Sequence, residues 1–243
     1  MNRRPIRLFQ MVLLLVAVTI LIGGDLQAKG LERGTPAYEE SLVKDIGERE
    51  KLPETDVPRS EWYTAQAVQG WGPMPRVFPK IERLVETLPP GTDIIQWKRD
   101  RVIAIAKHYI GLPYRHHHIP GWSPATGSKL NPQPGPGLDC SDFTAWVYNF
   151  GFGIPLNSDV VSQSQMQARP GYILPKGIRR IEPGEGFLPG DLLYIMDSSK
   201  THIVHVVLFI DEEHIIDSTG THVDVRHFSG WYRERLSHGI RIF

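Results

Sequence analysis

Cys140 is the only cysteine in the 243-residue chain, and it is the residue best suited to do chemistry. A single cysteine cannot form an internal disulfide, so it is either an inert thiol or a reactive one. It follows a Pro- and Gly-rich loop that ends at Gly137, and Phe143 and Trp146 begin an apolar pattern with helical spacing. This pattern predicts a helix that starts at the thiol, where the helix dipole lowers a thiol pKa. We interpret Cys140 as a nucleophile; a small buried hydrophobe is the alternative.

A thiol nucleophile needs a base that the fold brings close, and His205 is the best candidate. It lies in the apolar run 203–210, which predicts a strand. Asp217 follows twelve positions later on the next predicted strand, so an antiparallel pair would bring the two side chains together. An aspartate there would fix the tautomer of the imidazole. The alternatives are a structural core histidine and an aspartate that begins a turn.

The elements that must position these residues form one predicted domain, from about residue 99 to residue 243. A helix over 102–110 ends at Gly111, and the cysteine helix follows a long loop. Because helices come first and an antiparallel meander follows, we predict an α+β fold. The expected strands are 192–196, 202–210, 214–218, 222–227 and 239–243.

The first 28 residues have the pattern of an export signal. Three arginines precede the apolar run 11–22, which is short for a membrane span and typical of a signal peptide. We therefore expect an exported protein, periplasmic or extracellular, with a retained membrane anchor as the alternative. Removing residues 1–28 takes three arginines and one aspartate from 27 basic and 27 acidic residues, which leaves 24 and 26. This balance provides no basic surface for nucleic acid.

Residues 29–98 form an N-terminal extension in which we recognise no motif. Residues 29–60 are polar and charged, which predicts a linker or a loosely ordered segment. Residues 80–88 predict a short helix that ends before Pro89. One hypothesis is that the extension covers an active-site cleft and regulates it.

Several short segments together resemble the signature blocks of the NlpC family, which are papain-like cysteine peptidases of the bacterial cell wall. The blocks read LDCSDF at 138–143, LPGDL at 188–192 and HVVLF at 205–209, and IGLPY at 110–114 resembles the block before the cysteine. The resemblance covers about residues 99–243 in the family's order. It implies a papain-like α+β fold, with the cysteine helix packed on an antiparallel sheet. It also implies a substrate, the peptidoglycan stem peptide, often cut between γ-D-glutamate and a diamino acid.

The resemblance implies a role for each matching residue and requires no cofactor. Cys140 would be the nucleophile and His205 the general base, while Asp217 stands at a third position that is commonly histidine. Asp139 and Ser141 match residues that hold the substrate's free amine in some members. Tyr114 matches a tyrosine near the reacting carbonyl. The residues implied to bind substrate are Tyr114, Asp139 and Ser141.

The chain departs from the family pattern near the cysteine. Residues 115–118 read RHHH where members often have an aromatic residue and two glycines, the loop to Cys140 is long, and Asp142 replaces a glycine. These departures affect substrate specificity more than the chemistry. Adjacent histidines are poorly spaced to bind one metal ion, so we interpret His116, His117 and His118 as a polar rim, with a zinc site as the alternative.

Two other functions use the same fold. An amidase or acyltransferase would share the acyl-enzyme chemistry of a thiol peptidase. A non-catalytic wall-binding protein would keep the fold without the reaction. The presence of Cys140, His205 and Asp217 together favours an enzyme.

Overall fold

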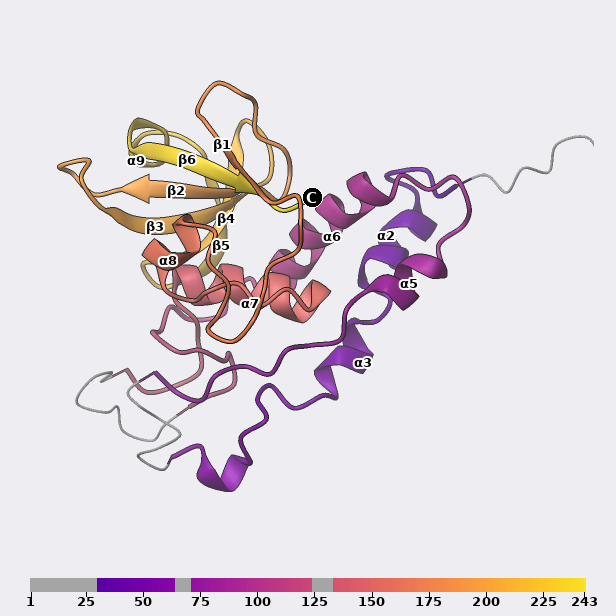
Figure 1. The fold of residues 1–243 in the computed structure, drawn as a ribbon, viewed down its shortest axis with the longest axis horizontal. Helices are drawn as coiled ribbons and strands as arrows, with labels where there is room; N and C mark the ends of the chain where they lie inside the picture. The colour runs from indigo at the N-terminus through magenta and orange to yellow at the C-terminus, as the bar shows by residue number, and fades with distance from the viewer. Residues whose placement is uncertain (1–29, 64–70, 124–132) are drawn as a thin grey trace, which may run out of the picture.

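The structure is a computed structural model that describes residues 30–63, 71–123 and 133–243 (Figure 1). The expected export signal lies outside these residues. No helix within the described ranges is long and apolar enough to cross a membrane. The helices are α2 (Pro36–Val43), α3 (Ile46–Glu50), the 3-10 turn η1 (Arg59–Glu61), α5 (Glu82–Glu86), α6 (Ile94–His108), α7 (Cys140–Phe152), α8 (Val160–Ser164) and α9 (Trp231–Glu234). The strands are β1 (Arg179–Ile181), β2 (Leu192–Met196), β3 (Ile203–Phe209), β4 (His214–Thr219), β5 (His222–His227) and β6 (Leu236–Arg241).

The six strands form one sheet in the order β1-β6-β2-β3-β4-β5, and every pair of neighbours is antiparallel. The predicted meander is therefore present as β2 to β5. The last strand begins earlier than expected, at Leu236, because it pairs with β2 along most of its length. This α+β arrangement, with helices packed on an antiparallel sheet, is the fold class that the sequence predicts.

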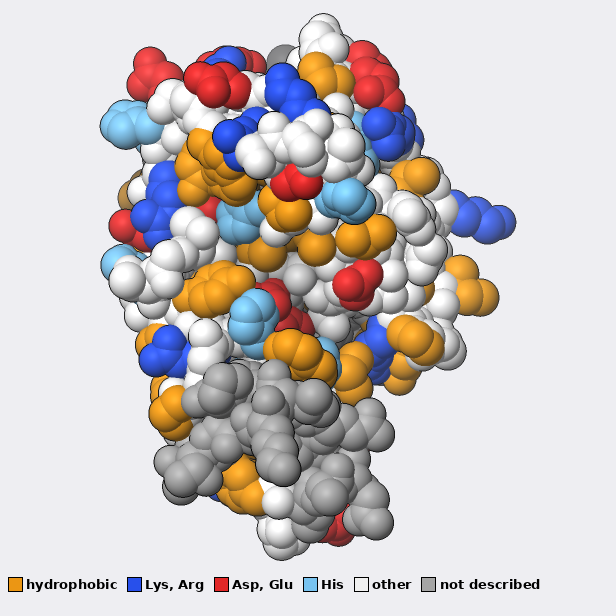
Figure 2. Space-filling model, turned by 90° about the vertical axis from the view of Figure 1, so that its left-hand side faces the viewer, with side chains coloured by type: hydrophobic (Ala, Val, Ile, Leu, Met, Phe, Trp, Pro, Cys, Tyr) orange, Lys and Arg blue, Asp and Glu red, His pale blue; other side chains and the backbone are white. Residues whose placement is uncertain are grey.

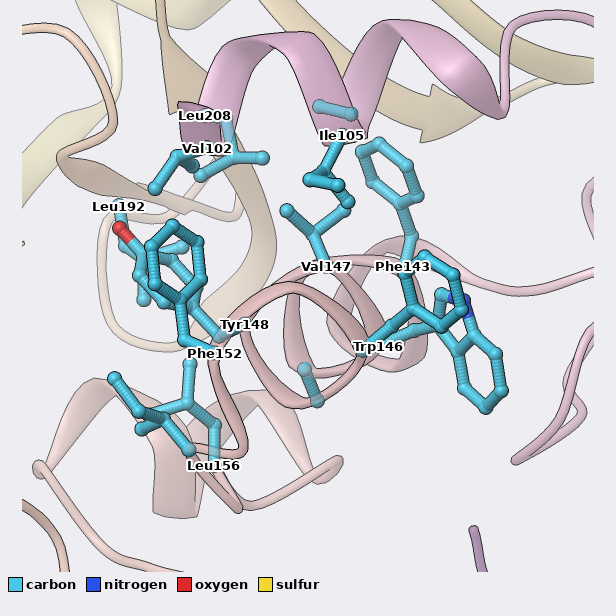
Figure 3. Packing of buried hydrophobic residues seen from close by; sticks show 14 of the residues in the cluster. Val102, Ile105, Phe143, Trp146, Val147, Tyr148, Phe152, Leu156, Leu192 and Leu208 are labelled. Carbon is cyan, nitrogen blue, oxygen red and sulfur yellow. The ribbon is translucent and has the colours of Figure 1, made fainter. Parts of the chain in front are cut away.

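The cysteine helix α7 is the centre of the core, and all of its residues are buried. It contacts α6 on one side and strands β3 and β4 on another. Figure 3 shows Val102 and Ile105 of α6 over α7, with Leu208 of β3 close by. Because α7 is fixed along its whole length, its first residue has a defined position relative to the sheet.

Residues 30–60 of the N-terminal extension form short helices that join the main core, and this differs from the linker or loosely ordered segment expected for residues 29–60. Tyr38, Leu42 and Ile46 are spaced by four, and all three are buried in the main core. Helix α2 packs on α6, and the Trp97 Nε1–H donates to Ser41 Oγ at 2.8 Å. Figure 1 shows α6 between the sheet and the N-terminal helices. Several of the charged residues that suggested disorder, such as Glu39, Glu40 and Glu48, are exposed on short helices, whereas Arg49 is buried.

Two arginines join the extension to the end of α7. Arg49 donates from Nη1 to the Phe150 carbonyl at 2.7 Å, and Arg101 donates from Nη2 to the Gly151 carbonyl at 3.2 Å. Carbonyls in the last turn of a helix have no partner within that helix, so these bonds satisfy groups that would otherwise be buried without one. The start of the predicted domain at residue 99 thus falls inside α6, and the core continues into the extension.

Candidate active site

Cys140 is the first residue of α7, and Asp139 caps the helix. The Asp139 Oδ1 atom accepts from the Ser141 N–H at 2.9 Å and from the Asp142 N–H at 2.8 Å. The thiol is 6% exposed and accepts backbone hydrogen bonds from Val206 and Ser141. Because Val206 follows His205 on β3, the thiol lies against the strand that carries the expected base.

The environment of the thiol corrects one expectation. Burial raises the pKa of the Cys140 thiol, and the charges of Asp139 and Asp142 raise it further; the backbone hydrogen bonds from Val206 and Ser141 act in the opposite direction. The lowering that we expected at the helix N-terminus is therefore outweighed by burial, because the sequence does not show how deeply the thiol is buried. A thiolate here therefore requires a cation beside it.

His205 and Asp217 meet across the β3–β4 pair. The imidazole Nε2 lies 2.6 Å from Asp217 Oδ2, and the aspartate is fully buried. A carboxylate accepts only, so Nε2 carries the hydrogen and Nδ1 is the atom that can exchange a proton. This is the tautomer that a general base in a thiol mechanism needs.

Two further residues hold Asp217, and sequence reasoning missed both. Arg226 on β5 donates from Nε to Asp217 Oδ1 at 2.8 Å, and the Tyr232 hydroxyl on α9 donates to Oδ2 at 3.0 Å. The only signal in the sequence is that a β4–β5 hairpin places Arg226 near Asp217 across the ladder. With three donors, the buried carboxylate has partners on both oxygens.

The residues expected to bind substrate gather at the start of α7. Ser141 Oγ donates to Asp139 Oδ1 at 3.1 Å, so these two residues form one unit. Tyr114 pairs with Leu138 in a short parallel bridge that holds it next to the cap. Burial raises the pKa of the Tyr114 hydroxyl, and the nearby charges of Asp139, Cys140 and Asp142 contribute.

The three adjacent histidines point in different directions. His116 Nδ1 lies 3.0 Å from Asp139 Oδ2, and His118 Nδ1 lies 3.1 Å from Asp142 Oδ1. His117 turns inward, is fully buried, and packs edge-on against Trp122; burial lowers its pKa to about 4. The expected polar rim therefore consists of His116 and His118 only. Among the residues with described positions, no group of three or more His, Cys, Asp or Glu side chains is placed to hold a metal ion.

The face of the molecule on which α8 lies is mixed in character. Figure 2 views the side on which α8 lies and shows histidine, acidic and apolar side chains together in the middle of this face. Such a surface suits a ligand with both polar and apolar groups.

The sequence matches the NlpC/P60 family over residues 114–241, which is more than half of the chain. The chain belongs to the NlpC/P60 family. The family match confirms the resemblance seen in the signature blocks. No curated protein matches the chain.

Solved structures of NlpC/P60 proteins are among those similar to this chain. An NlpC/P60 family protein from Bacillus cereus is 24% identical over 59% of this chain and 40% of its own, with a TM-score of 0.43. The peptidoglycan hydrolase RipB from Mycobacterium tuberculosis is 17% identical over 92% of this chain and 89% of its own, with a TM-score of 0.42. RipD from M. tuberculosis, described as a non-catalytic NlpC/p60 domain protein adapted to peptidoglycan binding, is 16% identical over 60% of this chain and 97% of its own, with a TM-score of 0.42. The chain thus spans less than half the length of the Bacillus protein.

Replacing Asp142, the residue that stands where the NlpC/P60 pattern has glycine, should move ionisation of the Cys140 thiol to lower pH. The Asp142 charge raises the pKa of the thiol, and burial raises the pKa of Asp142 itself to about 7, so the carboxyl is charged when the thiol titrates. In Asp142→Asn the amide oxygen still accepts from His118, but the charge is gone. The measurement is the pH dependence of Cys140 alkylation by iodoacetamide, followed by protein mass.

The matched control for this prediction is Asp211→Asn, which changes an exposed aspartate in the turn before β4. It should leave the alkylation profile unchanged. An unchanged profile in folded Asp142→Asn protein would show that this charge does not act on the thiol.

Proposed function

We propose that this protein is an exported cysteine peptidase that hydrolyses peptidoglycan stem peptides, at the bond between γ-D-glutamate and a diamino acid. The observation that carries the proposal is the 2.6 Å bond between His205 and the buried Asp217, which prepares a base on the strand beside Cys140. Membership of the NlpC/P60 family supports peptidoglycan as the partner, because members of this family hydrolyse or bind it. Export is proposed from the apolar run 11–22 that follows three arginines.

The mechanism starts with a proton transfer within the site. The Cys140 thiol passes its proton to His205 Nδ1, and Asp217 stabilises the imidazolium that forms. The thiolate attacks the carbonyl carbon of the scissile amide. His205 then protonates the departing amine, which leaves a thioester on Cys140.

Water completes the cycle. His205, now neutral, accepts a proton from a water molecule that attacks the thioester, and the carboxylic acid leaves as the thiol is restored. The Ser141 and Asp142 amides already donate to Asp139, so the oxyanion must be stabilised by other donors.

The experiment is product analysis by mass spectrometry. Protein lacking residues 1–28 is incubated with purified peptidoglycan fragments, and a Cys140→Ala protein serves as the blank. New peptide ends produced only by the unsubstituted protein would establish the peptidase and identify the bond. Binding of the fragments without any cleavage would instead favour a wall-binding protein, and cleavage by the Cys140→Ala protein would refute the thiol mechanism.

A further inference from the structure

Two carboxylates lie beside the nucleophile, and each is paired with a histidine from the segment before the cysteine. Asp139 caps α7 and Asp142 lies in its first turn. An unpaired carboxylate at this place would attract a substrate ammonium, because a charge-assisted hydrogen bond is stronger than a neutral one. The state of these carboxylates therefore bears on which substrates the site accepts.

Donors of the protein itself surround Asp139. Its Oδ1 accepts from the Ser141 N–H, the Asp142 N–H and the Ser141 hydroxyl. Its Oδ2 lies 3.0 Å from His116 Nδ1, and the Asp139 side chain is only 15% exposed. A substrate ammonium that approached this carboxylate would have to share Oδ2 with the imidazole or displace it.

The imidazole is held in this position by more than the carboxylate. The His116 ring packs edge-on against Trp71, with ring centroids 5.5 Å apart, and against Tyr114 at 5.3 Å. Its backbone N–H donates to Gln133 Oε1 at 3.1 Å. The hydrogen bond to Asp139 raises the pKa of His116, which favours a positive charge on the ring. His116 Nδ1 thus already occupies the place of a hydrogen-bond donor at the oxygen that an ammonium group would contact.

We propose that the His116–Asp139 pair sets the substrate class, so that stem peptides with an acylated amino terminus bind as well as those with a free amine. This inference rests on the proposed function, since it concerns the substrate of the same site. Acylated termini occur in stems that are still joined to the glycan through an amide. The free ammonium gains one contact with Asp139 but breaks another, so it brings little net advantage.

The test compares two peptides that differ only in acetylation of the amino terminus. Their dissociation constants are measured by calorimetry on Cys140→Ala protein, so that binding is read without turnover. We expect the two constants to agree within about threefold. In Cys140→Ala/His116→Ala protein the Asp139 Oδ2 atom, which has lost its imidazole partner, should favour the free amine by about tenfold or more, the effect of one charge-assisted hydrogen bond.

The control variant is His108→Ala in the same background. His108 forms a similar pair with Glu50, at 2.7 Å, on the exposed surface of α6. It should leave the ratio of the two constants unchanged, and thermal melting checks that each variant is folded.

The outcomes separate this inference from the proposed function. A preference of tenfold or more for the free amine in the protein with His116 intact would overturn the inference, even if the His116 variant failed to fold. So would an unchanged ratio in folded His116→Ala protein, or a failure to bind either peptide. If both peptides bind equally but the unsubstituted protein cleaves neither, the proposed peptidase activity fails and the inference about binding stands.

Discussion

Asp217→Asn is expected to lower kcat by about 10³- to 10⁴-fold, the loss seen when the orienting carboxylate of a catalytic histidine becomes an amide. The reason lies in the donors around the side chain. Arg226 always donates, so the amide oxygen must face Arg226 Nε at the position of Oδ1. The NH₂ group then faces His205 Nε2 and donates to it. This moves the imidazole hydrogen to Nδ1. The Nδ1 atom must carry no hydrogen if it is to accept the proton of the Cys140 thiol.

The rate of stem-peptide hydrolysis, measured with a melting curve for each variant, checks this prediction. Tyr232→Phe is the matched control, because it removes one donor from the same oxygen and leaves the charge and the tautomer unchanged. Its kcat should fall by no more than about tenfold, the smaller effect of a supporting hydrogen bond. If folded Asp217→Asn protein kept kcat within tenfold of the unsubstituted enzyme, Asp217 would not set the tautomer of His205.

The sequence predicts the sheet well because its strands are bounded by strong turn signals. The limits of β2 and β5 are those expected, β3 is one residue shorter than expected at each end, and β4 is one residue longer at its C-terminal end. Strand β1 was not predicted. It has three residues, two of them exposed, and it exists because β6, far along the chain, pairs with it. Short elements of this kind depend on tertiary contacts that periodicity does not record.

In the site too, contacts between neighbouring strands could be predicted from the sequence, and contacts from more distant elements could not. The spacing of His205 and Asp217 on consecutive strands was enough to predict that they meet, because hairpin geometry is local. The partners Arg226 and Tyr232 come from β5 and α9 and converge on Asp217 only in the folded chain. The pKa of Cys140 follows from burial, which helix position alone does not give. Hence the contact between His205 and Asp217 was predictable, and the residues that hold Asp217 were not.

The N-terminal extension was misjudged for a related reason. Its composition is polar, but its few apolar residues are placed to join the core, and buried arginines on both sides of residue 98 bind carbonyls across this boundary. Arg101 is the main example. It is fully buried, donates to the Leu42 carbonyl and the Gly151 carbonyl, and pairs with Asp45 at 2.7 Å. This one side chain joins α2, the loop before α3 and the end of α7.

Arg101→Met should therefore lower the free energy of unfolding by about 3–5 kcal/mol, mainly the cost of leaving the Leu42 and Gly151 carbonyls without their buried donor. The methionine fills much of the volume, and Asp45 keeps its pair with Arg49, so the loss comes from the two carbonyls and from one of the two cations of Asp45 rather than from a cavity. Urea denaturation measures it, as a lower midpoint with an unchanged slope.

The control variant for this loss of unfolding free energy is Arg33→Met. Arg33 also pairs with an aspartate, Asp100, at 2.7 Å, but its side chain is 61% exposed. Exposed pairs contribute about 0–1 kcal/mol, so this variant should be nearly neutral. Equal losses in the two variants would contradict the prediction. A large loss in Arg101→Met alone would show that the buried bonds of Arg101 to the extension and to the end of α7 contribute to the stability of the fold.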